Sequence, residues 1–192
     1  MNTEDPYVDP GSGVLVNLLG VTDADVLRQI EAEVVVLRDA ELKVTTLPGR
    51  FDLAHLSAFH RRLFGDVYPW AGELRRVDIA RTSLFAHWRH VESYGDYLFG
   101  RLREERHLAD LGREVFLDRF AHHFAEVNAL HPFREGNGRA QRAFFWQLAL
   151  HAGWRVDFAA LDVDKFHRAC RESMTGGSDT LRELFDGVTG PA

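Results

Sequence analysis

Two amphipathic segments joined by a short turn-forming stretch constrain the fold of this chain more than any other feature. Each segment repeats apolar residues every three or four positions, which is the spacing of one face of an α-helix. The apolar positions are Phe116, Phe120, Phe124 and Val127 in the first segment, and Ala140, Phe144, Leu148 and Ala152 in the second. Because such faces must be buried against other elements, the sequence predicts a helical bundle.

Similar but weaker patterns run through most of the remaining chain. Thr22 and Asp25 form a predicted capping box for one helix, and Asp52 is the predicted cap of the next. The expected buried stripes are Val26, Ile30, Val34 and Leu37 in the first of these helices, and Leu53, Leu56, His60 and Leu63 in the second. Further helices are expected at 88–102, 164–174 and 179–186.

Residues 74–85 depart from the helical pattern. Val77 and Ile79 alternate weakly with polar residues, which predicts a short β-hairpin or an extended flap. No repeat, linker or low-complexity tract divides the chain, so one domain over residues 1–192 is the simplest organisation. The expected fold class is mainly α, a helical bundle with one short β-hairpin.

Composition excludes several classes of protein and location. The net charge of −6 gives no overall field for nucleic acid, so direct nucleic-acid binding is not expected. No apolar run exceeds four residues, far short of the roughly twenty that a membrane-spanning helix needs. The acidic start lacks a signal-peptide pattern, and one cysteine, Cys170, fits a reducing compartment. A cytoplasmic protein without membrane contact is therefore expected.

The candidate chemistry lies between the two strongest helices. Pro132 should end the first helix and present His131, a candidate general base, at the mouth of a loop. The run Gly136, Asn137 and Gly138 tolerates positive φ and precedes a helix, so its backbone N–H groups predict a phosphate-binding turn. Glu135 beside this turn is a candidate Mg²⁺ ligand.

Two arginines follow at the start of the second helix. Arg139 and Arg142 are three residues apart, so they share one face of the first turn and suit planar contacts to phosphate oxygens. Over residues 131–142 the local charge is +2 in a chain of net −6. The sequence thus predicts a base, a metal ligand, an anion-binding turn and two phosphate-binding arginines within twelve residues.

Other chemistries are less well supported. The histidines His122, His123 and His131 lack the spacing of a zinc-binding helix. Cys170 has no local feature of a nucleophile and is expected to be a small buried residue. No P-loop or dinucleotide-binding fingerprint is present.

The segment from His131 to Arg142 resembles the signature of the Fic family, HPFx(D/E)GNGRxxR, at every defined position. Shorter similarities surround it, and together they extend the resemblance over residues 5–187. They are Asp5-Pro6-Tyr7, the residues 17–20, Tyr68-Pro69-Trp70-Ala71-Gly72-Glu73, Asp78-Ile79, and Ser83 with Phe85-Ala86. The resemblance implies a protein adenylyltransferase that moves AMP from Mg-ATP to a Tyr, Ser or Thr hydroxyl of a target protein.

The resemblance also implies roles for the individual residues. His131 would deprotonate the target hydroxyl, a task that suits the ordinary histidine pKa of about 6.5. Glu135 would bind the Mg²⁺ that bridges the α- and β-phosphates. The residues expected to hold the ATP phosphates, by backbone, amide or guanidinium donors, are Gly136, Asn137, Gly138, Arg139 and Arg142. Phe133 would anchor the loop in the core.

The stretch 78–90 would correspond to the family's flap, which pairs with the target as an added strand. Its expected target-docking residues are Asp78, Ile79, Ser83 and Phe85. Here Ala86-His87-Trp88 stands where relatives often have Ala-Pro-Pro, so target choice or adenine-pocket shape is expected to differ.

Two alternatives to a protein adenylyltransferase stay open. The Doc-like kinase branch has Lys where this chain has Gly138, and the open turn favours AMP transfer over phosphorylation. A Fic-fold binding module without transfer activity is the second alternative.

Regulation forms the last part of the resemblance. The inhibitory helix pattern (S/T)xxxE(G/N) of many Fic proteins is absent from this sequence. The stand-alone toxin type is therefore implied, held inactive by a small antitoxin that places a Glu on Arg142. The implied targets are the ATPase subunits of DNA gyrase and topoisomerase IV.

Overall fold

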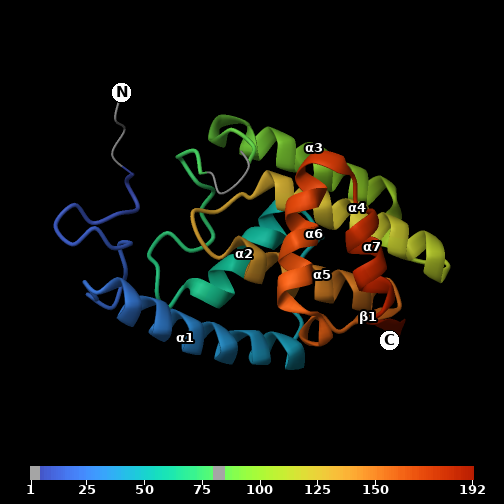
Figure 1. Cartoon of the computed structure of the whole chain (residues 1–192), viewed down its shortest axis with the longest axis horizontal. Helices are drawn as coiled ribbons and strands as arrows, with labels where there is room; N and C mark the ends of the chain where they lie inside the picture. The colour runs from blue at the N-terminus through green and yellow to red at the C-terminus, as the bar shows by residue number, and fades with distance from the viewer. Residues whose placement is uncertain (1–4, 80–84) are drawn as a thin grey trace.

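The computed structural model describes residues 5–79 and 85–192, most of which are helical (Figure 1). In this part of the chain there are seven α-helices and three single-turn 3-10 segments. The α-helices are α1 (Ala24–Val44), α2 (Leu53–Phe64), α3 (Val91–Glu104), α4 (Arg113–Leu130), α5 (Asn137–His151), α6 (Val163–Gly176) and α7 (Asp179–Asp186). The long connection between α2 and α3 contains residues 65–87. The predicted mainly α fold class is confirmed.

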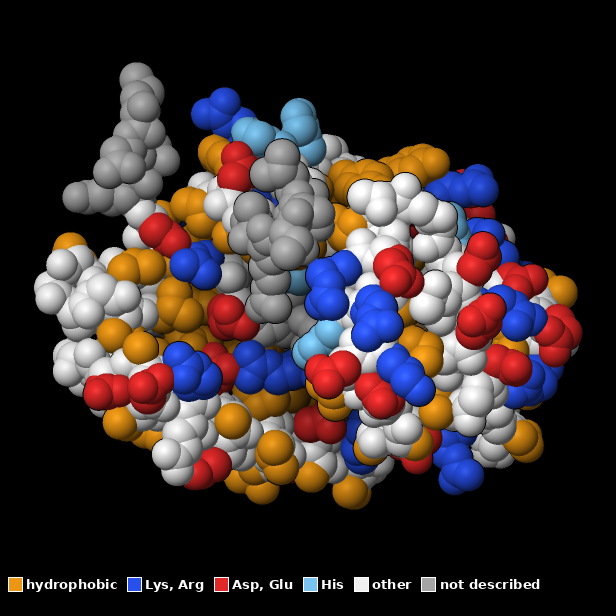
Figure 2. All heavy atoms as spheres, in the orientation of Figure 1, with side chains coloured by type: hydrophobic (Ala, Val, Ile, Leu, Met, Phe, Trp, Pro, Cys, Tyr) orange, Lys and Arg blue, Asp and Glu red, His pale blue; other side chains and the backbone are white. Residues whose placement is uncertain are grey.

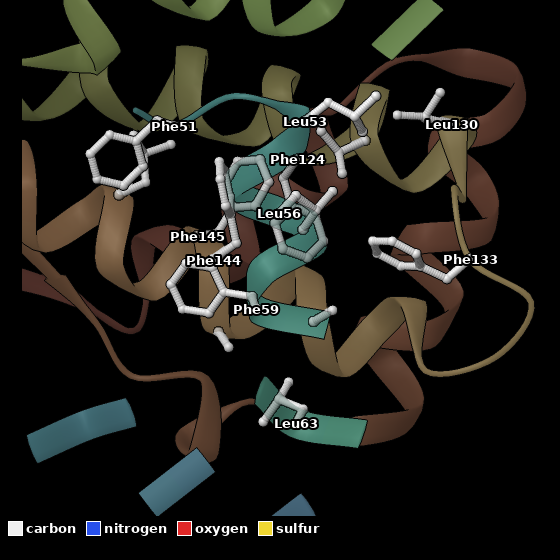
Figure 3. Packing of buried hydrophobic residues seen from close by; sticks show 14 of the residues in the cluster. Phe51, Leu53, Leu56, Phe59, Leu63, Phe124, Leu130, Phe133, Phe144 and Phe145 are labelled. Carbon is white, nitrogen blue, oxygen red and sulfur yellow. The ribbon is translucent and has the colours of Figure 1, made fainter. Parts of the chain in front are cut away.

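Helix α5 packs against both α2 and α4, and the predicted aromatic stripes meet there (Figure 3). The ring of Phe144 in α5 lies edge-on to that of Phe59 in α2, with centroids 5.9 Å apart. Phe145 makes the same kind of contact with Phe124 of α4 at 4.9 Å. Each such pair adds about 0.5–1.5 kcal/mol to the burial of the rings. Helix α5 is therefore held in place by both α2 and α4, and α4 and α5 are the two helices that flank the candidate site.

The prediction for α2 is confirmed in its cap and in its buried face. Asp52 precedes the helix, and its carboxylate accepts a hydrogen bond from the backbone N–H of His55. All four residues predicted to point inward are buried, including the polar His60.

Helix α1, along one edge of the bundle in Figure 1, faces the core with residues one position later than predicted. Val26 and Leu37 are 47% and 59% exposed. The buried positions are Leu27, Glu31, Val35 and Leu42. The apolar pattern was misleading because Glu31, a carboxylate, occupies a core position by pairing with Arg139 and Tyr68.

The cap of α1 also differs by one residue from the prediction. Asp23, and not Thr22, precedes the helix, and its carboxylate accepts hydrogen bonds from the N–H groups of Asp25 and Val26. Since aspartate and threonine are both good capping residues, the sequence alone did not separate them.

The two-stranded sheet of the described residues lies near the C-terminus. Strands β1 (Trp154–Val156) and β2 (Thr189–Pro191) pair antiparallel, with Arg155 opposite Gly190. The expected hairpin at 74–85 has no strand within 74–79 or at Phe85, and residues 80–84 lie outside the described part. That hairpin stays a prediction.

None of the helices in residues 5–79 and 85–192 combines the length and the apolar character that crossing a membrane requires.

Candidate active site

The loop between α4 and α5 is shaped by two residues with positive φ. His131 has φ 46° and ψ 64°, so α4 ends at Leu130, as Pro132 predicts. Of the three turn residues, only Gly136 uses positive φ (77°), because Asn137 already begins α5. A Cβ on Gly136 would lie 2.4 Å from Cζ of Phe64, so both its φ and its surroundings require glycine.

Buried side chains on the core side hold the loop between α4 and α5 in place. Phe133 is buried, as predicted, with its ring centroid 4.0 Å from that of His60. His60 accepts a hydrogen bond from the N–H of Gly72 at Nδ1, so its Nε2–H donates to the carbonyl of Glu135 at 2.8 Å. Burial lowers the pKa of His60 to about 4, which keeps the ring neutral in this role.

The side-chain amide of Asn137 holds the loop together. Its Oδ1 accepts from the backbone N–H of Phe133, and its Nδ2 donates to the carbonyl of the same residue, both at 2.8 Å. These two bonds use one of the two N–H groups on Nδ2, so the predicted amide contact to phosphate stays a prediction. The backbone N–H groups of Asn137 and Gly138 remain at the N-terminus of α5, where an α-helix has no internal acceptors for them.

Among the described residues, Asn128 and Phe85 orient the candidate base His131 through a hydrogen bond and a ring contact. Its Nδ1 lies 3.2 Å from the carbonyl oxygen of Asn128, and a carbonyl only accepts, so Nδ1 carries the proton of the neutral ring. The basic lone pair is then on Nε2. Phe85 stacks on the imidazole with centroids 3.7 Å apart and planes 15° apart.

The predicted site residues surround one cleft of about 760 Å³. Those among its lining are Asp78, Ile79, Phe85, His131, Glu135, Gly136, Asn137, Gly138, Arg139 and Arg142. Ser83 lies outside the described residues. Figure 2 shows several basic side chains gathered near the centre of this face of the molecule, among scattered acidic ones.

One wall of the cleft escaped sequence reasoning. Helix α6 contributes Phe166, His167, Cys170, Arg171 and Met174. No local sequence pattern indicates this wall, because only tertiary packing brings α6 beside the loop. Burial raises the pKa of the Cys170 thiol to about 12, so the residue is a protonated lining group and not a nucleophile.

Arg139 is held by groups from three elements. Its Nη1 lies 2.5 Å from Oε1 of Glu31, its Nη2 lies 3.5 Å from Oε1 of Glu135, and its guanidinium covers the ring of Phe64 at 4.7 Å. Glu31 is only 5% exposed and also accepts the hydroxyl of Tyr68, whose pKa is raised by burial and by this carboxylate. Sequence reasoning missed Glu31 because it took the polar position for a solvent-facing one.

Arg142 differs from Arg139 in its lack of a carboxylate partner among the described residues. No carboxylate of the described residues lies within 4 Å of its guanidinium, and burial, followed by the charge of Arg139, lowers its pKa. Both arginines also line a second groove, of about 1070 Å³, between α1, α5 and the two strands. A partly buried cation with no close carboxylate is costly, because its charge is incompletely solvated, so this position favours an anionic ligand.

Glu135 is placed where a metal ion bound to phosphates would need a ligand. Its carboxylate accepts from the N–H of Gly136 at 2.9 Å and lines the cleft beside the start of α5. Mg²⁺ commonly takes one or two carboxylates and completes its shell with phosphate and water, so this donor set fits. Within the described residues no group of three or more His, Cys, Asp or Glu side chains could hold a metal alone.

The residues on either side of 80–84 are tied together at their base. Asp78 accepts a hydrogen bond from the N–H of Trp88 at 2.8 Å, and its carboxylate lies 3.2 Å from Nε2 of His87. The unusual Ala86-His87-Trp88 segment thus contacts the first of the predicted docking residues. At the cleft's other rim, Arg134 pairs with Asp5 at 2.8 Å.

Comparison with known proteins gives a consistent family. The model of the Fic/DOC family matches residues 50–149. The chain is 41% identical over 182 residues to the probable protein adenylyltransferase Fic of Salmonella typhimurium, covering 94% of this chain and 90% of that protein. It is 44% identical over 184 residues to the protein adenylyltransferase VbhT of Bartonella schoenbuchensis, but spans only 38% of VbhT's length.

Solved structures agree with these sequence relatives. The BepC protein of Bartonella tribocorum with bound AMPPNP superimposes with a TM-score of 0.91 at 28% identity, covering 97% of each chain. An N-terminal Fic domain from Bartonella quintana with bound ADP gives 0.91 at 26% identity, covering 96% of this chain and 94% of that one. The motif, the cleft built around it and these matches together place this chain in the Fic/DOC family.

Proposed function

We propose that this chain is a protein adenylyltransferase that moves AMP from ATP to a hydroxyl side chain of a target protein. The observation that carries the proposal is the joint lining of one cleft by a histidine base, a helix N-terminus and Arg142, a partly buried cation with no carboxylate of the described residues within 4 Å. Relatives that match most of this chain are named protein adenylyltransferases, and two similar structures hold AMPPNP and ADP.

The proposed reaction is a single displacement at the α-phosphorus. Nε2 of His131 takes the proton of the target hydroxyl as its oxygen bonds to phosphorus. The bond from phosphorus to the α,β-bridging oxygen breaks, and pyrophosphate leaves with that electron pair. Arg139, Arg142 and the first N–H groups of α5 offset the charge on pyrophosphate. Glu135 would hold Mg²⁺, which neutralises phosphate charge when bound.

The start of α5 supports AMP transfer over phosphorylation. Gly138 presents no side chain, and a Cβ there would lie 3.4 Å from Nη1 of Arg142. A lysine at this position would place its ammonium in the proposed phosphate site. With the space open, the β- and γ-phosphates occupy it and the α-phosphate faces His131.

The label on ATP separates the three candidate activities. The purified protein is incubated with host lysate and Mg²⁺, using ATP labelled on either the α- or the γ-phosphate. Transfer of the α-label to a protein is the expected result. Label arriving only from the γ-position would support the Doc-like kinase alternative, and no transfer in lysates of several hosts would support a binding module.

We further propose a bacterial toxin that acts on the ATPase subunit of DNA gyrase or topoisomerase IV. A target segment would dock along the residues Asp78, Ile79, Ser83 and Phe85. A small antitoxin would supply the carboxylate that Arg142 lacks, and would hold the enzyme inactive. Co-purification from the native host should recover such a partner, and purified gyrase or topoisomerase IV should accept the α-label.

Replacing Arg142 with alanine is expected to weaken ATP binding about ten- to a hundredfold. The loss corresponds to one charge-assisted contact of roughly 1.5–3 kcal/mol. Calorimetric titration with ATP measures it directly. The neighbouring Arg155→Ala, on strand β1 and outside the cleft, is the control, and unchanged ATP affinity in Arg142→Ala would remove the phosphate role.

Replacing Glu31 with glutamine is expected to weaken the binding of ATP and ADP by about tenfold, because Arg139 loses the buried carboxylate that holds it. AMP affinity should not change, since Arg139 is assigned to the outer phosphates. The exposed Glu33→Gln on the same helix is the matched control. Tighter ATP binding in Glu31→Gln would mean that this carboxylate competes with the nucleotide.

A further inference from the structure

Arg75 is a charged side chain with only 1% of its surface exposed, and no role was predicted for it. Its closest carboxylate among the described residues is that of Asp78, 3.7 Å from Nη1 and itself half exposed. Burial lowers the pKa of the guanidinium. A cation in this setting must be stabilised by hydrogen bonds, and those of Arg75 all go to backbone carbonyls.

These carbonyls belong to two separate parts of the site. Nε donates to the carbonyl of His131 at 2.8 Å, and Nη2 lies 3.4 Å from that of Leu130. Nη1 donates to Val77 at 2.9 Å, and Nη2 also donates to Ala86. One planar guanidinium therefore joins the end of α4 to the chain on both sides of the predicted docking segment.

A guanidinium group is well suited to join the end of α4 to the two ends of the docking segment. The last carbonyls of a helix have no internal donors and carry its negative dipole end, so a cation there is favourable. Arginine offers five N–H donors in a fixed plane, whereas the ammonium of lysine offers three from a single point. A lysine of the same charge can thus stabilise the dipole without spanning both sets of carbonyls.

The hydrogen bonds of Arg75 also support the backbone conformation of the candidate base, His131. His131 adopts a left-handed backbone conformation, which is unfavourable for a residue other than glycine and needs external support. Arg75 supplies it twice, since its side chain donates to the His131 carbonyl and its backbone N–H donates to the carbonyl of Pro132 at 2.9 Å. The carbonyl of Ala86 accepts from the same guanidinium, and the residue before it is Phe85, whose ring covers the imidazole.

We propose that Arg75 is a positioning residue that fixes the main chain of His131 and the two ends of the docking segment as one unit. The imidazole of His131 and the docking segment then keep the same relative position when the hydroxyl of the target protein binds. The proposal rests on the transfer reaction proposed above. It assigns Arg75 no contact with nucleotide, since the side chain is absent from the lining of the cleft in the described residues.

The test separates positioning from nucleotide binding and from folding. Arg75→Lys keeps the charge, Arg75→Met keeps the approximate volume, and the exposed neighbour Arg76→Met is the matched control. Transfer of the α-label should fall about a hundredfold in both Arg75 variants, the size expected for a misplacement near 1 Å. ATP affinity by calorimetry should stay within about threefold of wild type, and Arg76→Met should match wild type in both.

Two results would overturn the assignment. One is transfer near the wild-type rate in Arg75→Lys, which would make the residue a simple buried cation. The other is an equal loss of ATP affinity and transfer, which would indicate general damage to the site. If wild-type protein itself transfers no label, the proposed function fails and not the role of Arg75.

Chemical rescue supplies a second measurement. In Arg75→Ala, millimolar guanidinium ion should restore part of the transfer, because it can bridge the same carbonyls, whereas methylammonium should not. Equal rescue by both cations, or by neither, would contradict a role that depends on the planar arrangement of the guanidinium N–H donors.

Discussion

Replacing His131 with alanine is expected to lower transfer of the α-label by about 10²- to 10⁴-fold, the usual contribution of a positioned general base. Nδ1 of His131 is fixed by the carbonyl of Asn128, so Nε2 is the nitrogen that can take the proton. ATP binding should change little, because the proposed phosphate contacts come from α5 and not from His131. Single-turnover kinetics with α-labelled ATP measures the effect without a contribution from product release.

The control for this substitution comes from α4, the helix that ends just before His131. His122→Ala removes an imidazole from α4 that is not among the cleft-lining residues, and it should transfer label at the wild-type rate. A His131→Ala protein that keeps wild-type transfer would contradict the mechanism. A parallel loss of ATP affinity would show instead that the loop had been disturbed.

Replacing Gly136 with alanine is expected to destabilise the protein by about 2–4 kcal/mol, combining left-handed backbone strain with overpacking. The added Cβ would lie 2.4 Å from Cζ and 2.5 Å from Cε2 of Phe64, inside the contact distance of real atoms. Phe64 also supports the guanidinium of Arg139, so its displacement should weaken ATP binding. The midpoint of thermal unfolding should fall by roughly 5–15 °C, measured by calorimetry.

Gly153 provides a matched control for the same type of substitution. It has φ 85°, close to that of Gly136, but a Cβ there would meet no atom within 4 Å. Gly153→Ala therefore measures backbone strain alone, about 1 kcal/mol, and should leave ATP affinity unchanged. Equal effects of the two substitutions would contradict the steric role of Phe64.

The loop and its two helices were predictable because their determinants are local. Pro132 restricts the residue before it, Gly136 permits a conformation that other residues avoid, and the aromatic stripes set the faces of α4 and α5. These effects act over a few residues, so a pattern in the sequence is enough to find them. The phosphate-binding turn and the base follow from the same local order.

What could not be predicted depends on pairing between distant residues. Glu31 occupies a core position on α1 because Arg139 and Tyr68, far along the chain, satisfy its charge. Arg75 is buried because carbonyls from two other segments accept its donors. Hydropathy assigns both side chains to solvent, since it scores each residue without its partners.

The stacking of Phe85 on His131 has a consequence for the direction of attack. A ring at a centroid distance of 3.7 Å covers one face of the imidazole, but the Nε2 lone pair lies in the ring plane and not above it. An incoming hydroxyl must therefore approach edge-on, along a trajectory parallel to both rings. In the proposed reaction, Phe85 would therefore admit a target side chain that projects straight from an extended backbone and would block one that approaches through the covered face.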